Sequence, residues 1–285
     1  MELSIARLDF TVQTRGRRPA RTPQGPGSTV ADVLSLMGVD PCNEPQAACV
    51  PLAMRRLQAG DTLFHEGSRA TALYFVLAGM FKAFRTAQDG YEQVIDFAGR
   101  ADLLGFDALY TGVHPSAAVA LEICSVLAVP LRDLDGLVRQ IPALSGVVNR
   151  AASQALACRD DMAEMMAAVA AEVRLARFLM LWSRRMEAQG QSPRRLRLRM
   201  SRRDIASNLG VAHETVSRSF SALVQAGLIR VENREVEILC AQGLATFARS
   251  TRRHPDDAED AGLPVPVPVP APASSPARPA LRRVA

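Results

Sequence analysis

Short apolar runs alternate with polar turn residues between residues 57 and 132. Residues 63–64, 73–77 and 80–84 are such runs, and turns that contain glycine separate them. Short strands at intervals of about 8–12 residues are typical of a β-sandwich or a β-roll. The pattern therefore predicts a small β domain in the first half of the chain.

A different period follows the predicted strands. Apolar and small residues recur at alternating intervals of four and three residues over more than three heptads, which is the a/d pattern of a long helix packed against a partner helix. The simplest partner is the same helix of a second copy, and the alternative is packing on the helix's own domain. The predicted dimer seam consists of Leu144, Val148, Ala151, Ala155, Cys158, Met162, Met165 and Val169.

Residues 201–223 carry the pattern of two short helices joined by a tight turn. Ser201 is followed three positions later by an acid, which favours a capped helix start, and Gly210 supplies the turn. A helix over 172–189 precedes this pair, and apolar segments after it are typical of a hairpin. Together these elements predict a winged helix-turn-helix.

The predicted fold class is therefore α+β, with an N-terminal β-roll, a long dimerisation helix and a C-terminal winged helix-turn-helix. We expect a flexible N-terminal segment that contains Cys42 and Cys49, with a short helix over residues 28–37. A run of alternating prolines near the C-terminus indicates an extended, unpacked tail. The predicted divisions are 1–56, 57–140, 141–170, 171–250 and 251–285.

Charge is distributed unevenly along the chain. The net charge is +5, but residues 174–253 hold 16 arginines against six acidic residues, which suits a polyanion such as nucleic acid. No apolar run approaches the roughly 18–20 residues of a membrane helix, and no secretory signal is indicated. Five scattered cysteines do not form a secreted disulfide framework. We therefore expect a cytoplasmic protein without a membrane partner.

Three polar residues share one face near the start of the second helix of the predicted pair. Glu214, Ser217 and Arg218 stand at i, i+3 and i+4, so Arg218 can donate to guanine while Glu214 accepts from cytosine. The alternative is an exposed Glu–Arg pair that only stabilises the helix. The arginines expected to position the motif on phosphates are Arg194, Arg195, Arg197, Arg199, Arg202 and Arg203.

The order of β-roll, long helix and winged helix-turn-helix resembles the Crp/Fnr family of bacterial transcription regulators, and within it the Fnr branch. The matching motifs lie in residues 60–79, 99–116 and 183–218. The resemblance implies a cyclic-nucleotide-binding-like roll and, from Glu-x-x-Ser-Arg at the reading helix, a two-fold DNA site with TTGAT-like half-sites. It also implies that the turn at residues 88–92 contacts RNA polymerase.

One departure from the family pattern is Ala212. The family usually has a Ser or Thr there as the cap of the recognition helix, and loss of such a cap costs about 1 kcal/mol of local stability. We therefore expect looser docking of this helix than is usual in the family.

Residues of the roll bear on what the protein senses. Phe106 and Pro115 stand where cyclic-nucleotide-binding members of the family have a ribose-binding Glu and a phosphate-binding Arg, so no cyclic nucleotide is expected. The Fnr branch carries an iron–sulfur cluster on four cysteines, whereas only Cys42, Cys49 and Cys124 lie in plausible reach here, which disfavours a cluster. The alternatives are ordinary thiols or a disulfide switch between the first two.

The histidines and the search for catalytic motifs give no strong indication of a haem site or of an enzyme. His65 and His114 are haem ligands in principle, but a lone loop histidine is more often solvated or hydrogen-bonded. No nucleophile–base pair, metal-spaced cluster or phosphate loop is present, so no enzyme is predicted. The predicted function is a homodimeric, sequence-specific transcription regulator that responds to oxygen, redox state or a related signal. The alternative is a redox- or small-molecule-sensing module that binds nucleic acid without sequence preference.

Overall fold

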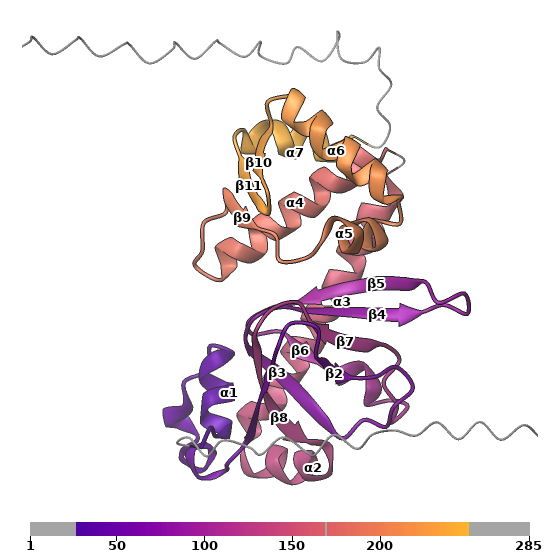
Figure 1. Ribbon diagram of the computed structural model, residues 1–285. Coiled ribbons are helices and arrows are strands. Elements are labelled where there is room, and N and C mark those ends of the chain that lie inside the picture. The colour runs from indigo at the N-terminus through magenta and orange to yellow at the C-terminus, as the bar shows by residue number, and fades with distance from the viewer. Residues whose placement is uncertain (1–26, 169, 251–285) are drawn as a thin grey trace, which may run out of the picture.

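The computed structural model describes residues 27–168 and 170–250 of the 285-residue chain. Two bodies stand one above the other, a β-roll with short helices below and a helical domain with a small sheet above, and the long helix α3 connects them (Figure 1). The predicted α+β fold is confirmed. The predicted Pro-rich tail at 251–285 lies outside the described residues.

Two four-stranded antiparallel sheets form the roll. The first has the strand order β1-β8-β3-β6 and the second β2-β7-β4-β5. The strands of the first sheet are β1 Ala53–Leu57, β8 Cys124–Pro130, β3 Ala72–Ala78 and β6 Leu103–Leu104. Those of the second are β2 Thr62–Phe64, β7 Ala117–Ala120, β4 Phe81–Thr86 and β5 Glu92–Ala98, and the short helix η3 Phe106–Ala108 follows β6.

The strands β3 and β8 of the first sheet are largely buried on both faces. On β3, Tyr74 and Val76 face the core between the two sheets, while Leu73 and Phe75 face the helices outside. β8 alternates in the same way, with Val126 inside the roll and Leu127 and Val129 packed on the helices. This double burial explains why the two strands read as continuous apolar runs.

The N-terminal segment differs from the prediction. Its helices are α1 Val30–Leu36, η1 Pro41–Asn43 and η2 Pro45–Cys49, and the predicted helix at 28–37 corresponds to α1. Val30, Val33 and Leu34 are fully buried against the roll. The part from residue 27 onward is therefore a packed layer rather than a flexible segment, and burial of these and other apolar side chains, among them Ala47 and Leu52, opposes the cost of ordering it.

Helix α2, Leu131–Gln140, leads into α3, Pro142–Ala167. Three of the predicted seam residues of α3 are buried within the chain itself. Leu144 and Ala151 are buried against the roll, and Met165 is buried against the upper domain. The other described seam residues are half-buried, and Val169 lies outside the described residues. The heptad repeat is thus largely used by the chain's own two cores.

The upper domain is the predicted winged helix-turn-helix. Its helices are α4 Ala171–Ala188, α5 Arg202–Leu209, α6 His213–Gln225 and α7 Ala241–Arg249. Its sheet has the order β10-β11-β9, formed by β10 Ile229–Glu232, β11 Glu235–Ile238 and β9 Arg195–Arg197. None of the helices in the described part of the chain has the length and apolar character of a membrane span.

Candidate DNA-binding surface

Glu214, Ser217 and Arg218 are exposed on one face of α6. The Ser217 hydroxyl donates to the backbone oxygen of His213 at 3.3 Å. Neither Glu214 nor Arg218 forms an ion pair with another described residue. The alternative of a Glu–Arg pair within the helix is therefore not what the structure shows, and both charged groups face outward.

The opposite face of α6 fixes the helix in the domain. Val216, Phe220 and Leu223 are buried in the core that α4 and α5 share. Ala212, the residue before α6, provides no side-chain cap, as the sequence predicted. Packing of the apolar face therefore holds the helix where a capping hydroxyl is missing.

Helix α5 is capped as predicted. The Asp204 amide donates to Ser201 Oγ at 3.1 Å, and the Ser201 amide donates to Asp204 Oδ2 at 2.9 Å. Gly210 ends the helix at φ +63°, a left-handed conformation that glycine adopts without a Cβ clash. A short turn then leads into α6.

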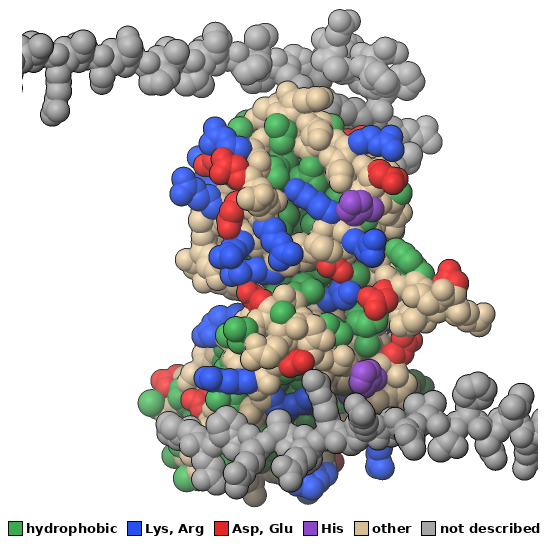
Figure 2. Space-filling model, viewed as in Figure 1, with side chains coloured by type: hydrophobic (Ala, Val, Ile, Leu, Met, Phe, Trp, Pro, Cys, Tyr) green, Lys and Arg blue, Asp and Glu red, His purple; other side chains and the backbone are tan. Residues whose placement is uncertain are grey.

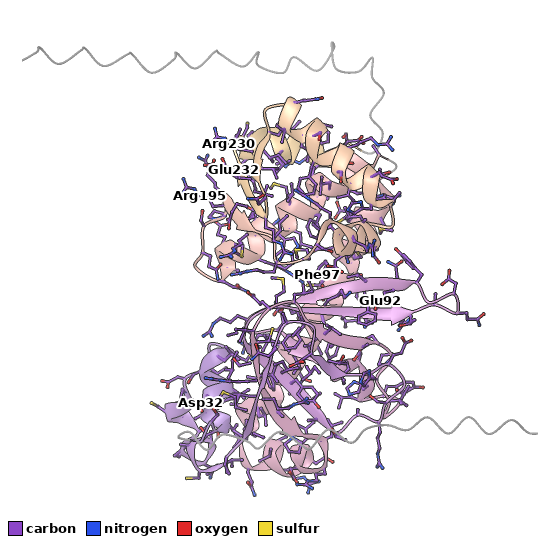
Figure 3. The ribbon with its side chains drawn as sticks, in the orientation of Figure 1. Asp32, Glu92, Phe97, Arg195, Arg230 and Glu232 are labelled. Atoms are coloured by element: carbon purple, nitrogen blue, oxygen red, sulfur yellow. The ribbon has the colours of Figure 1, made fainter. Side chains whose placement is uncertain are left out.

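The predicted phosphate-contacting arginines separate into different environments. Arg194 and Arg203 are exposed. Arg195 and Arg197 are also exposed, but each lies near a glutamate of the neighbouring strand β11. Positively charged side chains are prominent over this upper domain in Figure 2, and Arg195 and Arg230 project from its outer edge in Figure 3. These exposed arginines remain candidates for phosphate contact.

Two of the six arginines are used inside the protein. The Arg202 guanidinium lies 3.2 Å from the centroid of the Phe220 ring, its Nη1 is buried without a hydrogen-bond partner, and burial lowers its pKa to about 10. Arg199 Nη1 lies 2.9 Å from Glu122 Oε2 of the roll. Arg202 therefore packs under the reading helix and Arg199 connects the two domains, so neither presents a free cation to DNA.

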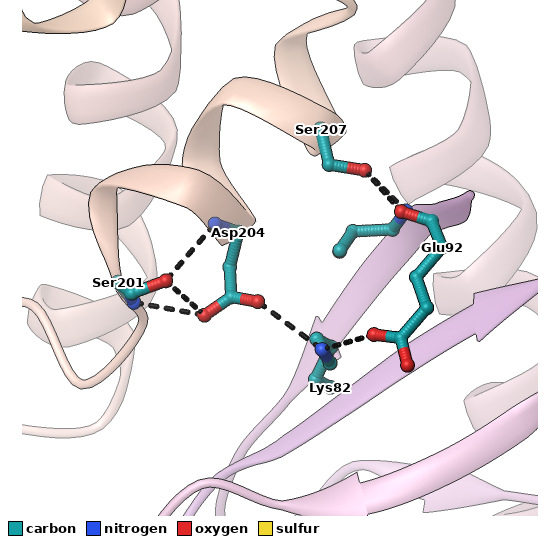
Figure 4. Close-up of polar contacts among 6 residues, drawn as sticks. Lys82, Glu92, Ser201, Asp204 and Ser207 are labelled. Carbon is teal, nitrogen blue, oxygen red and sulfur yellow. Dashed lines mark hydrogen bonds and ion pairs between the residues drawn. The ribbon is translucent and has the colours of Figure 1, made fainter. Parts of the chain in front are cut away.

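The roll holds α5 through a small polar network. Lys82 Nζ lies 2.9 Å from Glu92 Oε2 and 3.2 Å from Asp204 Oδ1, so one lysine connects the β4–β5 hairpin to the capping box of α5 (Figure 4). Burial lowers the pKa of Lys82, but the two carboxylates outweigh burial and raise it overall. Burial raises the pKa of Asp204, and Ser201 and Lys82 outweigh it and lower the pKa overall.

Backbone groups of β5 also bind α5. The buried Ser207 hydroxyl donates to Glu92 O at 2.7 Å and accepts from the Val94 amide at 2.8 Å. Asn208 Nδ2 donates to Ile95 O at 3.3 Å. Sequence reasoning missed these contacts and Lys82. The one available signal was that Lys82 is the single lysine among 34 basic residues.

A cavity of about 480 Å³ lies between the roll and α3. Phe106 lines it, as do Asp96 and Asp102, and burial raises the pKa of both carboxyl groups. Arg185 of α4 reaches the same region, donating to Phe97 O at 2.9 Å and to Cys158 Sγ at 3.1 Å. The roll, α3 and the winged helix thus meet at this cavity.

The cysteines predicted as cluster ligands do not converge. Cys124 pairs with Leu57 at one end of β1, whereas Cys49 precedes the other end, and β1 spans about 13 Å at 3.3 Å per residue. Cys42 and Cys49 are exposed, while Cys124 is buried with its thiol 3.3 Å from Met80 O. Within the described ranges, no three His, Cys, Asp or Glu side chains gather as metal ligands. The residues present do not fit an iron–sulfur cluster.

The two histidines of the roll differ. His65 is exposed. His114 is buried and stacks on Phe64 with ring centroids 3.8 Å apart, and its Nδ1 has no hydrogen-bond partner among the described residues. Burial lowers the pKa of His114, although Asp107 acts in the opposite direction. His114 is thus a packed aromatic side chain.

Comparison with known proteins agrees with this architecture. Residues 54–141 match the cyclic nucleotide-binding domain family, and residues 173–247 match the Crp-like helix-turn-helix domain family. The fumarate and nitrate reduction regulatory proteins of Salmonella typhimurium and of Escherichia coli K12 are each 37% identical over 196 residues, covering 69% of this chain and 78% of the relative.

Solved structures share the fold. FixK2 from Bradyrhizobium japonicum has a TM-score of 0.63 at 24% identity, over 71% of this chain and all of that one. A CooA mutant from Carboxydothermus hydrogenoformans has a TM-score of 0.59 at 19% identity, over 78% of this chain and 96% of that one. The curated relatives and the matched domain families show that the chain belongs to the Crp/Fnr family of DNA-binding transcription regulators, which are regulators rather than enzymes.

Proposed function

We propose that this regulator acts in the cytoplasm and binds, as a homodimer, a palindrome with TTGAT-like half-sites. The observation that carries the proposal is the exposed set Glu214, Ser217 and Arg218 on α6, with both charged groups free of ion pairs among the described residues. Two such helices one helical turn of DNA apart, about 34–36 Å, would each read one half-site.

A gel-shift series tests this reading of the surface. The wild-type protein should bind a TTGAT palindrome at least about tenfold more tightly than a scrambled duplex of equal length and charge. Equal affinities would favour the second candidate, a sensing module that binds nucleic acid through charge alone. Repeating the titration at several salt concentrations separates the two candidates. Binding through phosphates alone weakens alike for both duplexes, whereas base contacts keep the preference for the palindrome as the salt concentration rises.

The dimer contact is assigned to the side of α3 that the two cores leave free. Ser153, Leu156, Asp160 and Ala163 are exposed at intervals of three and four residues, and Leu156 is 59% exposed. An apolar side chain of this size on an open helix face is what a parallel helix pair would cover. We propose this face in place of Leu144, Ala151 and Met165, which the chain's own cores bury, and the half-buried seam residues stay a prediction.

RNA polymerase is the second protein partner proposed. The turn between β4 and β5 projects from the roll (Figure 1), and Tyr91 at its end is 50% exposed. Within the turn, Asp89 Oδ1 accepts a hydrogen bond from the Tyr91 amide at 3.0 Å. A Tyr91→Ala variant that binds DNA normally but no longer affects transcription in vitro would support this contact, and unchanged transcription would contradict it.

We propose that the signal is oxygen, redox state or a related cue. We further propose that the protein detects it without an iron–sulfur cluster on Cys42, Cys49 and Cys124. A cyclic nucleotide is disfavoured because Pro115 stands where the family resemblance expects a phosphate-binding arginine, and Phe106, which lines the cavity, stands where it expects a ribose-binding glutamate. Iron and acid-labile sulfide should be far below four per subunit in protein purified without oxygen. About four irons per subunit would overturn this view.

A further inference from the structure

Two arginines of α4 meet the carboxyl ends of three helices. Arg174 Nε donates to Ala168 O at 2.7 Å, where α3 ends, and its Nη1 donates to Leu209 O at 3.0 Å, at the last residue of α5. Each nitrogen thus serves a different helix. The same guanidinium therefore binds the dimer helix and the first helix of the reading motif.

Arg177 repeats the arrangement one turn later. Its Nε donates to Ala248 O at 2.7 Å, in the last turn of α7, and its Nη1 donates to Glu164 O, in the last turn of α3. Positions i and i+3 lie on one face of α4, so the two guanidinium groups stand side by side. The end of α3 is thereby bound twice, by the arginine that also binds α5 and by the arginine that also binds α7.

The chemistry of these contacts is specific to helix ends. The last four carbonyl groups of a helix have no intrahelical partner and carry the negative end of the helix dipole, so a cation there is favourable. Neither Arg174 nor Arg177 forms an ion pair with a described carboxylate. A planar guanidinium presents several donors in fixed directions and can serve two helix ends at once, which a lysine ammonium on one flexible stem does far less well.

A third contact lies at the same place. A Cβ placed on Gly210 would lie 2.7 Å from the Cε atom of Met166 of α3, so the turn between α5 and α6 lies directly against the dimer helix. Leu209 immediately precedes this turn, and α6 starts at His213. Only a few residues therefore separate the contact with the end of α3 from the first residue of the reading helix α6.

We propose that Arg174 and Arg177 are positioning residues that fix the angle between α3 and the reading helix, and so set the half-site spacing that the dimer accepts. In a two-fold dimer each reading helix is attached to one of the two paired α3 helices. The angle between α3 and the reading helix therefore determines the distance between the two reading helices. The proposal deepens the proposed function, on which its DNA readout rests.

The first test needs no DNA. Arg174→Lys and Arg177→Lys keep the charge but remove the double contact, and Arg184→Lys is the matched control because Arg184 is exposed on the same helix. Circular dichroism should show all three folded. Deuterium exchange should become faster in the last turn of α3 and at Gly210–Val211 in the first two variants, with α6 and the roll unchanged. Exchange equal to wild type would overturn the proposal.

The second test measures spacing. One inserted base pair moves a half-site by about 3.4 Å and rotates it by about 34°. Wild type and Arg184→Lys should lose about tenfold or more in affinity for the altered palindrome, since both half-sites no longer bind together. The double variant Arg174→Lys/Arg177→Lys should lose less than about threefold. Equal losses in all proteins would refute the proposal.

The two tests separate this inference from the proposed function. If wild type shows no preference for the palindrome over scrambled DNA, the proposed half-site is wrong, and the exchange experiment still decides the role of the arginines. If wild type prefers the palindrome but the double variant discriminates spacing as strongly as wild type, the proposed function stands and the positioning role is refuted.

Discussion

The ammonium group of Lys82 on β4 lies 3.2 Å from Oδ1 of Asp204 on α5, so the roll binds the same carboxylate that caps the first helix of the reading motif. The Lys82 and Asp204 side chains are only 14% and 16% exposed. The contact therefore involves largely desolvated charges, whose partners matter when one is removed.

Lys82→Met should destabilise the protein by about 1–3 kcal/mol, because it leaves two carboxylates facing an apolar side chain. The measurement is urea denaturation at neutral pH. Arg203→Ala, an exposed change one residue from Asp204, should stay within about 0.5 kcal/mol of wild type. A Lys82 variant as stable as wild type would mean that the contact contributes nothing to domain docking.

Arg218→Ala should weaken binding to the palindrome by about 1–3 kcal/mol and relax discrimination at one base position per half-site, since Arg is the commonest reader of guanine. Arg203→Ala should instead weaken binding to all sequences alike and reduce the salt dependence, as expected of a phosphate contact. Titrations against the palindrome and its single-base variants distinguish the two. Uniform weakening by Arg218→Ala would contradict base reading.

Leu156→Glu should raise the dimer dissociation constant by about tenfold or more, because it places a charge at a face proposed to be buried between two α3 helices. Sedimentation velocity over a concentration series measures this. Ile123→Glu is the control, since Ile123 is 69% exposed in the turn between β7 and β8 of the roll. Equal dimerisation of both variants would place the interface elsewhere.

Acid should destabilise the roll through His114. Its pKa is lowered from 6.5 by burial, so the unfolded state binds a proton that the folded state resists. The stability is present above about pH 6.5 and is lost as the pH falls below it. His114→Phe keeps the stacking on Phe64 and should lose less stability than wild type between pH 7 and pH 5. If the melting temperatures of the wild type and of His114→Phe fell by the same amount between pH 7 and pH 5, the prediction would be refuted.

Gly79→Ala should cost about 1–3 kcal/mol, because Gly79 has φ +85° and an added Cβ would lie 2.5 Å from the Cys124 thiol. The Cβ would also lie 2.7 Å from Ile123 O and 2.8 Å from Cys124 Cα. Adding Cys124→Ala should therefore fail to restore the melting temperature. Full restoration would show that the thiol alone causes the clash.

The reading motif was predictable from sequence because its signals are local. Ser201 and Asp204 form the expected capping box, Gly210 takes the left-handed turn, and the residues proposed to read bases share the expected face. Local capping and turn chemistry depends on neighbours in the chain and needs no knowledge of distant contacts.

Other features depended on contacts between distant segments. A heptad repeat shows that one face of α3 is covered, but not whether a partner helix or the chain's own cores cover it, and Leu144 and Met165 proved to belong to the cores. Arg202 was predicted to contact phosphate, but its guanidinium packs on the Phe220 ring, which lies 18 positions further along the chain. Ser207 and Asn208 gave no signal because their partners are backbone groups 113 to 115 residues away.

The bonds from Ser207 and Asn208 have a consequence for the roll by itself. β5 is the outermost strand of its sheet, and an uncovered outermost strand offers unpaired amides and carbonyls to any other extended chain. Helix α5 covers part of this outermost strand. If the reading domain moved away from the roll, the backbone groups of β5 would be exposed and could pair with a strand of another chain. Large movements of this domain therefore carry a risk of aggregation as well as a loss of register on DNA.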